Sequence, residues 1–266
     1  MAVSIRVVVI GAVLLTVAAP LRAAENPPDS FLCYLAGAAK TKKMAPISGA
    51  HLEVRDRFGD RSFVMRRLAA LCNPARLDGG ERSHDTIHLV GITIKDEKKA
   101  PKLVPFSLGV SDRFGTRQLE LGALASVLDV TPAQPGATAP ADFSDDPTNS
   151  AVEVNRFKCY AIASPKGAPK IAEPPPVVIV DDGFPGGQPF LVRKPTKVCL
   201  PADVAGATPG AETRRDILVC WSVKLPKGAK FVRQMVGTRS RSVGVRIVGR
   251  RKPAEACFAA RLFPGD

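Results

Sequence analysis

The six cysteines are the residues whose type and spacing point most directly to chemistry, and that chemistry is disulfide formation. They fall into three successive pairs whose members are 39, 40 and 37 residues apart. An apolar, strand-like phrase carries each cysteine. The near-constant separation indicates a structural segment used repeatedly, with one cysteine where it opens and one where it closes.

A further segment lies between the first and second pairs and has neither cysteine. Val90 stands at its opening position and Leu128 at its closing position. An unpaired thiol is reactive in an oxidising compartment, so the joint absence of both cysteines is what the loss of a bonded pair leaves behind. Among the connectivities open to six cysteines, this favours pairing within each segment. The expected disulfides are Cys33–Cys72, Cys159–Cys199 and Cys220–Cys257.

A second recurring phrase, Asp-Arg-Phe-Gly, supplies carboxylates at Asp56 and Asp112, and a looser version begins at Asp182. As a catalytic site, the phrase would offer general acid and base groups, with Arg57 and Arg113 as anion clamps. As a tight turn, it would use Asp to bond the turn backbone and Gly to adopt positive φ. We favour the turn, because repeated turns place their aspartates at equivalent rather than converging positions. A secreted carboxylate-dependent hydrolase is the alternative.

Histidine chemistry is limited, since the chain has only three histidines. His84 and His88 have the spacing of zinc ligands on a helix, but Gly79-Gly80 and the β-rich run after Ile87 argue against a helix there. The sequence has no Gly-x-Ser-x-Gly elbow, no phosphate-binding glycine-rich loop and no His-Glu-x-x-His motif. We therefore expect a non-catalytic protein with no cofactor, no bound metal and no catalytic residue.

Positive charge is concentrated near the C-terminus of a chain whose formal net charge is +13. Residues 214–252 hold twelve Lys and Arg against one acid, Asp216, a net charge of +11. Such a basic face attracts anionic polymers in a salt-dependent way. The alternative is a solvated face that only keeps the protein soluble. Nucleic acid is disfavoured as a partner, because the segment has few aromatic side chains for stacking. The candidate anion-binding residues are Arg239, Arg241, Arg246, Arg250, Arg251 and Lys252.

The elements that must position these residues are strands. The chain has 22 Gly and 24 Pro, which separate short runs rich in Val, Ile and Leu. Every second residue is apolar in 52–55, 106–110 and 243–247, a pattern typical of half-buried strands. Helical spacing occurs only in 65–71 and 119–128, where a single turn or the start of a strand would also account for it. Each segment therefore has room for about three strands.

A longer repeat predicts the domain organisation, because Cys33, Asp56 and Cys72 recur in the same order as Cys159, Asp182 and Cys199. We expect an all-β fold of two similar tandem domains, each a small β-barrel or sandwich made of two pseudo-equivalent three-stranded units. The first domain is placed at 25–130 and the second at 153–266. Residues 131–152, rich in Pro, Ala and Asp, are placed as a linker, and their acidic cluster lacks the ligand alternation of a calcium loop.

The N-terminus predicts export. Residues 1–24 have an early positive charge at Arg6, an apolar run from Val7 to Ala19 and small residues at Ala23-Ala24, as in a signal peptide. The run is shorter than the ~20 residues that a membrane-spanning helix needs, and no later segment is apolar enough to be a transmembrane segment. We expect a periplasmic or extracellular protein, in which disulfides persist.

Together, the Cys-Tyr opening phrase, the Asp-x-Phe-Gly centre and the Leu-Cys-x-Pro-Ala closing phrase resemble an uncharacterised family of secreted bacterial repeat domains, a domain of unknown function. The resemblance covers residues 31–130 and 157–260. It is weaker in the second segment, which lacks the cysteines, and in the fourth, which lacks the centre phrase. It implies export and a repeated domain, and it supplies no catalytic residue.

Overall fold

The computed structural model describes residues 29–38, 46–81, 87–136, 156–163, 176–183 and 187–263, which form twelve strands and one short 3₁₀ helix, η1 (Ala211–Thr213). The strands are β1 (Ser30–Ala38), β2 (His51–Asp56), β3 (Gly59–Leu77), β4 (Ile87–Asp96), β5 (Phe106–Asp112), β6 (Gly115–Pro135), β7 (Arg156–Ala163), β8 (Val177–Asp181), β9 (Gln188–Val204), β10 (Asp216–Lys224), β11 (Gln234–Ser240) and β12 (Gly244–Leu262). Among the described residues, no helix is long and apolar enough to cross a membrane. The expected signal peptide lies outside them.

The all-β prediction is confirmed, and side-chain alternation explains why these runs are strands. In β2, Leu52 and Val54 are buried while Glu53 and Arg55 are exposed, as period two requires. The two runs with helical spacing, 65–71 and 119–128, lie within the long strands β3 and β6. Their apolar residues recur at irregular intervals because the register shifts along both strands.

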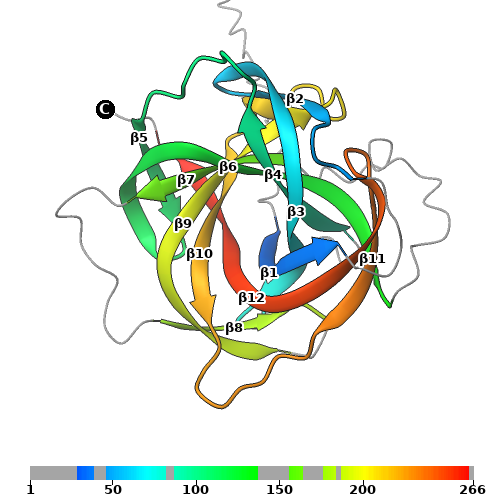
Figure 1. Ribbon diagram of the computed structural model, residues 1–266. Helices are drawn as coiled ribbons and strands as arrows, with labels where there is room; N and C mark the ends of the chain where they lie inside the picture. The colour runs from blue at the N-terminus through cyan, green and yellow to red at the C-terminus, as the bar shows by residue number, and fades with distance from the viewer. Residues whose placement is uncertain are drawn as a thin grey trace, which may run out of the picture.

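Eight of the strands form a closed antiparallel ring (Figure 1). The order around the ring is β1, β3, β4, β6, β7, β9, β10 and β12, and β12 pairs with β1 again. Each of the four chain segments contributes its first and last strand as neighbours. Closure leaves none of these eight strands as a free edge along this part of its length.

The two-domain arrangement is not confirmed, because all twelve strands belong to one sheet. Two separate domains would each have to close on themselves. Instead, β6 of the expected first domain pairs with β7 of the second, and β12 pairs back to β1. Residues 131–135, the start of the expected linker, belong to strand β6, so the strand continues into the proline-rich stretch. Residues 137–155 lie outside the described part of the chain.

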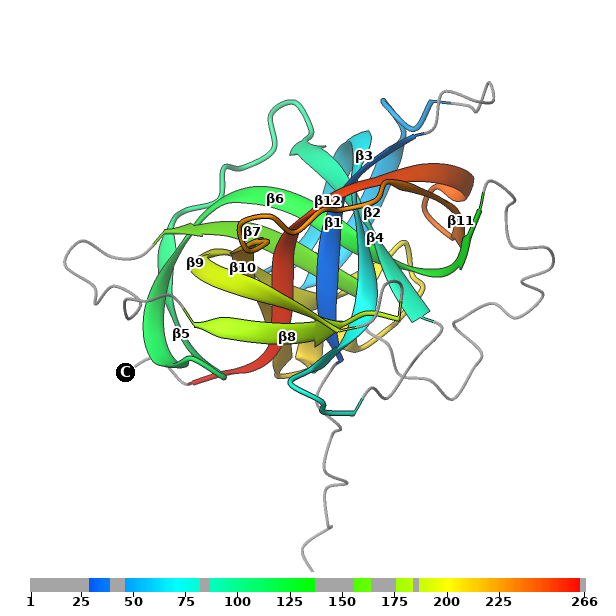
Figure 2. The same cartoon turned by 90° about the horizontal axis from the view of Figure 1, so that it is seen from below.

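The middle strand of each segment forms a hairpin with the start of the closing strand and folds over the outside of the ring (Figure 2). Each hairpin also reaches the segment two further on around the ring. β2 pairs with β9, β5 with β12, β8 with β3 and β11 with β6. These pairings join segments that are not adjacent in the ring.

Apolar side chains accordingly pack in three places. One cluster lies inside the ring and contains all six cysteines with residues such as Phe31 and Phe157. A second lies under β5 and β8 and includes Trp221, and a third lies under β2 and β11 and includes Phe63. The ring is therefore packed on both faces, and the cysteines belong to its inner face.

Candidate ligand-binding site

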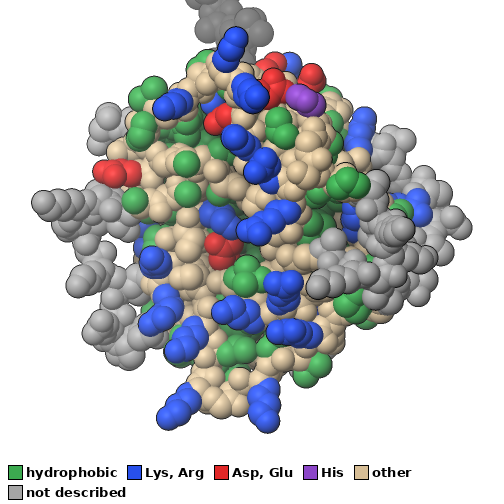
Figure 3. Space-filling model, in the orientation of Figure 1, with side chains coloured by type: hydrophobic (Ala, Val, Ile, Leu, Met, Phe, Trp, Pro, Cys, Tyr) green, Lys and Arg blue, Asp and Glu red, His purple; other side chains and the backbone are tan. Residues whose placement is uncertain are grey.

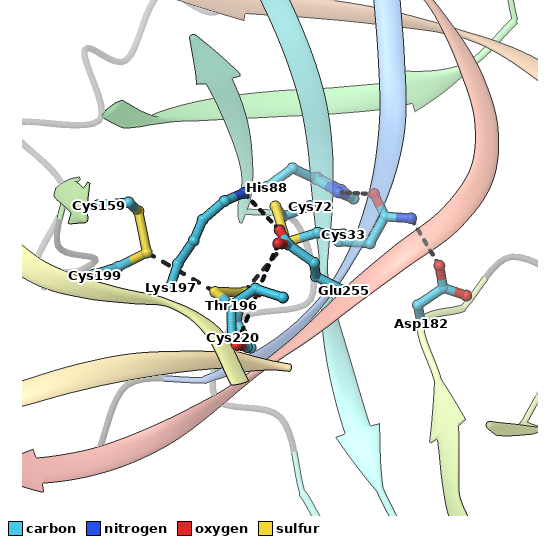
Figure 4. Close-up of a disulfide and its surroundings, with 12 residues drawn as sticks. Cys33, Cys72, His88, Cys159, Asp182, Thr196, Lys197, Cys199, Cys220 and Glu255 are labelled. Carbon is cyan, nitrogen blue, oxygen red and sulfur yellow. Dashed lines mark hydrogen bonds and ion pairs between the residues drawn. A yellow bond between two sulfur atoms is a disulfide. The ribbon is translucent and has the colours of Figure 1, made fainter. Parts of the chain in front are cut away.

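The three expected disulfides, Cys33–Cys72, Cys159–Cys199 and Cys220–Cys257, are confirmed. Each joins residues that lie directly opposite each other on the opening and closing strands of one segment. The disulfides also contact one another inside the ring (Figure 4). Sγ of Cys33 lies 3.6 Å from Sγ of Cys257, and Sγ of Cys199 lies 3.9 Å from Sγ of Cys220. Six sulfur atoms thus form one continuous layer across the ring.

The second segment completes this layer without sulfur. Gly91 lies opposite Leu128 in the register that cysteines occupy elsewhere, so the assignment of Val90 to the opening cysteine position is wrong by one residue. Val90 points instead to the outer face of the ring and packs in the cluster with Phe63. A Cβ at position 91 would lie 2.8 Å from Cβ of Ala70 and 3.3 Å from Leu128. Leu128 therefore fills the space of a disulfide, and glycine makes room for it.

One layer further along the ring, each closing strand contributes one residue two positions before its cysteine or its equivalent. These residues are Ala70, Ser126, Lys197 and Glu255. Nζ of Lys197 donates to Glu255 at 2.7 Å, and the Thr196 hydroxyl donates to the other carboxylate oxygen at 2.7 Å. Figure 4 shows these head groups meeting beside the disulfides. Large polar side chains thus occupy one half of the layer and small ones the other.

The small side chains leave a cavity of about 210 Å³ inside the ring. Its floor consists of the disulfides and Leu128, and its walls include Ala70 and Ser126. Leu35, which is 42% exposed, and the partly exposed Lys197 also line the cavity, so it opens to solvent on their side. Most of the lining side chains are apolar, and the polar groups gather toward the opening. The arrangement can hold a compact apolar group, as cavities of this size do.

Basic residues surround the opening. The register of every closing strand shifts five to six positions before the cysteine or its equivalent, which marks a β-bulge. In three of the four strands the bulge carries two adjacent basic residues, and all six are exposed. We call them the rim pairs: Arg66-Arg67 in β3, Arg193-Lys194 in β9 and Arg251-Lys252 in β12. The bulge in β6 has Gly122-Ala123 instead.

The rim pairs stand three to four residues beyond the cavity walls, roughly 10–13 Å along each strand. None of the six side chains forms an ion pair with another described residue. Lys and Arg outnumber acidic side chains over the face seen in Figure 3, which includes β9, β10 and β12. Three uncompensated positive pairs around an apolar cavity give the site its electrostatic character.

The structure separates the six predicted anion-binding residues. Arg251 and Lys252 form one rim pair, and Arg241 is exposed in the β11–β12 turn. Thr238 lies opposite Arg246, so strand alternation places Arg246 and Arg239 on opposite faces of that hairpin. These residues therefore do not share one face.

The prediction that Arg250 belongs to the anion-binding surface is wrong, because its side chain is buried. The side chain bonds Asp182 at 3.4 Å and also donates to Gln234. Burial lowers the pKa of Arg250, while Tyr34 and Asp182 act in the opposite direction. The guanidinium compensates a buried carboxylate, so it cannot face a polymer in solvent.

The recurring aspartates hold turns and bond across the ring. Asp56 accepts the amide N–H of Phe58 at 3.0 Å, and Asp112 accepts that of Phe114 at 2.8 Å, which confirms the turn interpretation. Each also bonds a side chain from the segment two further on. The cross-ring bonds run from the Tyr160 hydroxyl to Asp56, from Trp221 Nε1 to Asp112 and from the Tyr34 hydroxyl to Asp182.

These bonds leave little carboxylate for catalysis. Asp56 is also paired with Lys158 at 3.3 Å and Asp112 with Arg117 at 3.1 Å, and both carboxylates are fully buried. Burial lowers the pKa of Lys158, and its pairing with Asp56 opposes that shift. Of the proposed anion clamps, Arg113 is paired with Asp78, while Arg57 lies at the exposed β2–β3 turn.

A second hollow, of about 370 Å³, gathers carboxylates of Glu53, Asp60 and Asp203 beside the β2–β3 hairpin. Asp60 is bound by Arg55 at 2.5 and 2.7 Å, and Asp203 accepts the amide N–H of Thr208 at 2.8 Å. The bond from Arg55 lowers the pKa of Asp60, which is opposite to the need of a general acid. This hollow does not favour the hydrolase.

The histidines do not form a metal site in the described part of the chain, where no cluster of three metal-binding side chains occurs. His88 is buried and its Nδ1 lies 3.0 Å from Oδ1 of Asn73, whose amide donates to Asp182 at 2.8 Å. His84 lies outside the described residues. His88 therefore belongs to a buried polar chain that continues the Asp182 cluster.

Comparison with known proteins gives no relative. No family model, no curated protein and no solved structure matches this chain significantly. The resemblance to a secreted repeat family therefore stays a prediction, and the function has to be argued from the site itself.

Sequence reasoning did not find the cavity or the rim. The available signal was the adjacent basic pair that precedes three closing cysteines at the same distance. Charge density along the chain points only to Arg251-Lys252, which lies in the basic segment 214–252. The other two pairs lie in segments of near-neutral composition, so density alone could not reveal them.

Proposed function

We propose that this chain is an exported, disulfide-stabilised, non-catalytic protein built from a duplicated unit, and that it binds an anionic envelope or matrix polymer. The observation that carries the proposal is the set of rim pairs. Three strands that are far apart in sequence each present, around one opening, two basic side chains that form no ion pair with another described residue. The binding surface is thus the rim of the ring rather than the last segment alone. The repeated register of the four segments supports duplication, and the disulfides support export.

Polymer rather than a single small anion fits the spacing of the charges. Each exposed pair by itself binds an anion only weakly in water, because salt screens solvent-exposed charges over a Debye length of ~8 Å at physiological ionic strength. A polymer engages several pairs at once and gains from their effective concentration. The affinity for the polymer should therefore rise more than additively with the number of rim pairs engaged, and it should fall steeply with added salt.

Retention on heparin-agarose, used as a polyanion probe, tests the proposal. The rim variant R193Q/K194Q/R251Q/K252Q should elute at much lower salt than the parent chain. The control variant K227Q/K230Q/R233Q/R241Q also loses four positive charges, from exposed positions away from the bulges, and should elute close to the parent. Equal shifts in the two variants would show that net charge alone governs retention and would reject the rim as the site.

A further inference from the structure

The cavity inside the ring lies directly below the proposed anion-binding rim, and its lining is graded in polarity. Disulfide sulfur and the Leu128 side chain form the floor. Lys197, Glu255 and Thr93 line the upper part, nearer the bulges. A ligand that enters from the rim would therefore meet charge first and apolar surface last.

The polar groups at the upper level are themselves satisfied. Glu255 accepts from Lys197 and from Thr196, each at 2.7 Å, and the Thr93 hydroxyl donates to the carbonyl of Arg67 at 3.1 Å. An ammonium group has three donors, so Lys197 retains donors beyond its bond to Glu255. The upper level can bond an anionic oxygen without breaking an existing contact.

The size of the cavity limits what enters it. A dry apolar cavity of about 150 Å³ holds a benzene molecule. The present cavity of about 210 Å³ therefore accommodates one six-membered ring or a short branched alkyl group, but not a long acyl chain. The space exists because Ala70 and Ser126 stand where the other two segments have Lys197 and Glu255.

We propose that the cavity binds the compact apolar group of an anion whose charged group lies at the cavity opening, where Lys197 retains free donors and the rim pairs beyond it add positive charge. This inference rests on the proposed function for its anionic contact, and it adds a ligand class: an anion bearing a ring-sized apolar substituent. Burial of such a group is worth about 1.5–3 kcal/mol of transfer free energy, so it should strengthen binding roughly 10- to 100-fold over the same anion without the group.

The experiment compares phenyl phosphate with methyl phosphate by NMR titration at constant ionic strength. The two probes carry the same charge and differ in the apolar group. The parent chain should bind phenyl phosphate at least ~10-fold more tightly. Ala70→Leu, which fills the cavity, should remove this preference, so that the variant binds the two probes equally. Ala229→Leu, at an exposed position in the β10–β11 connection, should preserve the preference.

Further variants make the outcomes decisive. If Ala70→Leu does not fold, Ser126→Leu fills the cavity from another strand and should give the same loss. The rim variant R193Q/K194Q/R251Q/K252Q should weaken both probes. Equal affinity of the parent chain for the two probes, or a preference that survives both filling variants, would overturn the inference. A different result is that the parent chain prefers phenyl phosphate while the rim variant and the parent chain elute from heparin at the same salt concentration. That result would overturn the proposed polymer function and leave the cavity inference intact.

Discussion

At the scale of single residues, the cross-ring bonds explain why an aspartate ends three of the four hairpins. Asp56 and Asp112 each close their own turn and also accept a donor from the opposite segment. Asp182 likewise accepts the Tyr34 hydroxyl. The equivalent bond between the fourth hairpin and the second segment lacks both its acceptor and its donor. Ser240 ends the β11 hairpin, and Ile92 follows Gly91 where the other segments have Tyr or Trp. Loss of donor and acceptor together avoids a buried polar group without a partner, which would cost about 1–3 kcal/mol.

Removal of the Tyr160 hydroxyl tests the strength of such a bond. Burial, followed by the charge of Asp56, raises the pKa of Tyr160 above its ordinary value, so the hydroxyl keeps its proton at neutral pH and donates to Asp56. Tyr160→Phe should lower the free energy of unfolding by about 2 kcal/mol, as for hydrogen bonds to charged groups. Urea denaturation measures this change. Thr116→Val, which removes an exposed hydroxyl, should cost less than ~0.5 kcal/mol, and an equal cost in both variants would contradict the assignment.

At the scale of elements, Asp78 fastens three of them at one point. It follows the end of β3 with a φ of 49°, accepts the amide N–H of Ile179 in β8 at 2.9 Å and also accepts from Arg113 in the β5–β6 turn. Its own amide donates to the carbonyl of Ile179 at 2.8 Å. Two hairpins of different segments are thereby anchored to one closing strand.

This anchor predicts a pH-dependent loss of stability. The bond from Ile179, and then that from Arg113, lower the pKa of Asp78 below its ordinary value of 3.8. A carboxyl whose pKa is lower in the folded state than in the unfolded state stabilises the fold at pH values above its unfolded-state pKa. That stabilisation is lost as the pH falls through the folded-state pKa. Asp78→Asn tolerates the positive φ but removes the charge.

The variant should be less stable than the parent by up to ~1 kcal/mol at pH 7, because the pair is partly exposed. The difference should shrink below pH 3.8. Thermal unfolding at pH 7, 4, 3 and 2.5 measures it. A difference that stays constant down to the lowest pH would show that the charge of Asp78 contributes nothing.

At the scale of the whole molecule, closure of one ring makes the two halves of the chain mutually dependent. Pairing of β6 with β7 and of β12 with β1 joins them in the ring, and β2–β9 and β8–β3 join them outside it. Each disulfide lies wholly within one half. Strand pairing and packing, rather than covalent bonds, therefore connect the halves apart from the chain segment between β6 and β7.

Cutting that segment tests the single sheet against two tandem domains. A protease site inserted between residues 137 and 155 and then cleaved should give two fragments that remain associated in size-exclusion chromatography. They should separate only in denaturant, with one cooperative unfolding transition, because neither half closes its own ring. Fragments that separate and stay folded in native buffer would establish the two-domain arrangement instead.

Local spacing in the sequence determined the strand class and the disulfide pairing. Two cysteines at a fixed separation within one segment indicate that the opening and closing strands of that segment contact each other. The same holds for the turns at Asp56 and Asp112, whose Asp and Gly act on their own backbone. These features depend on a few residues within one segment, so pattern alone predicted them.

Only the tertiary structure decided which edges meet, and therefore whether the four segments close as one ring or as two domains. That choice depends on pairings between segments, such as β12 with β1, and no local pattern encodes them. The cavity arises in the same way, since Ala70 and Ser126 are small beside Lys197 and Glu255 only once the four closing strands share a layer. The rim pairs likewise gain a common function because ring closure places three distant bulges around one opening.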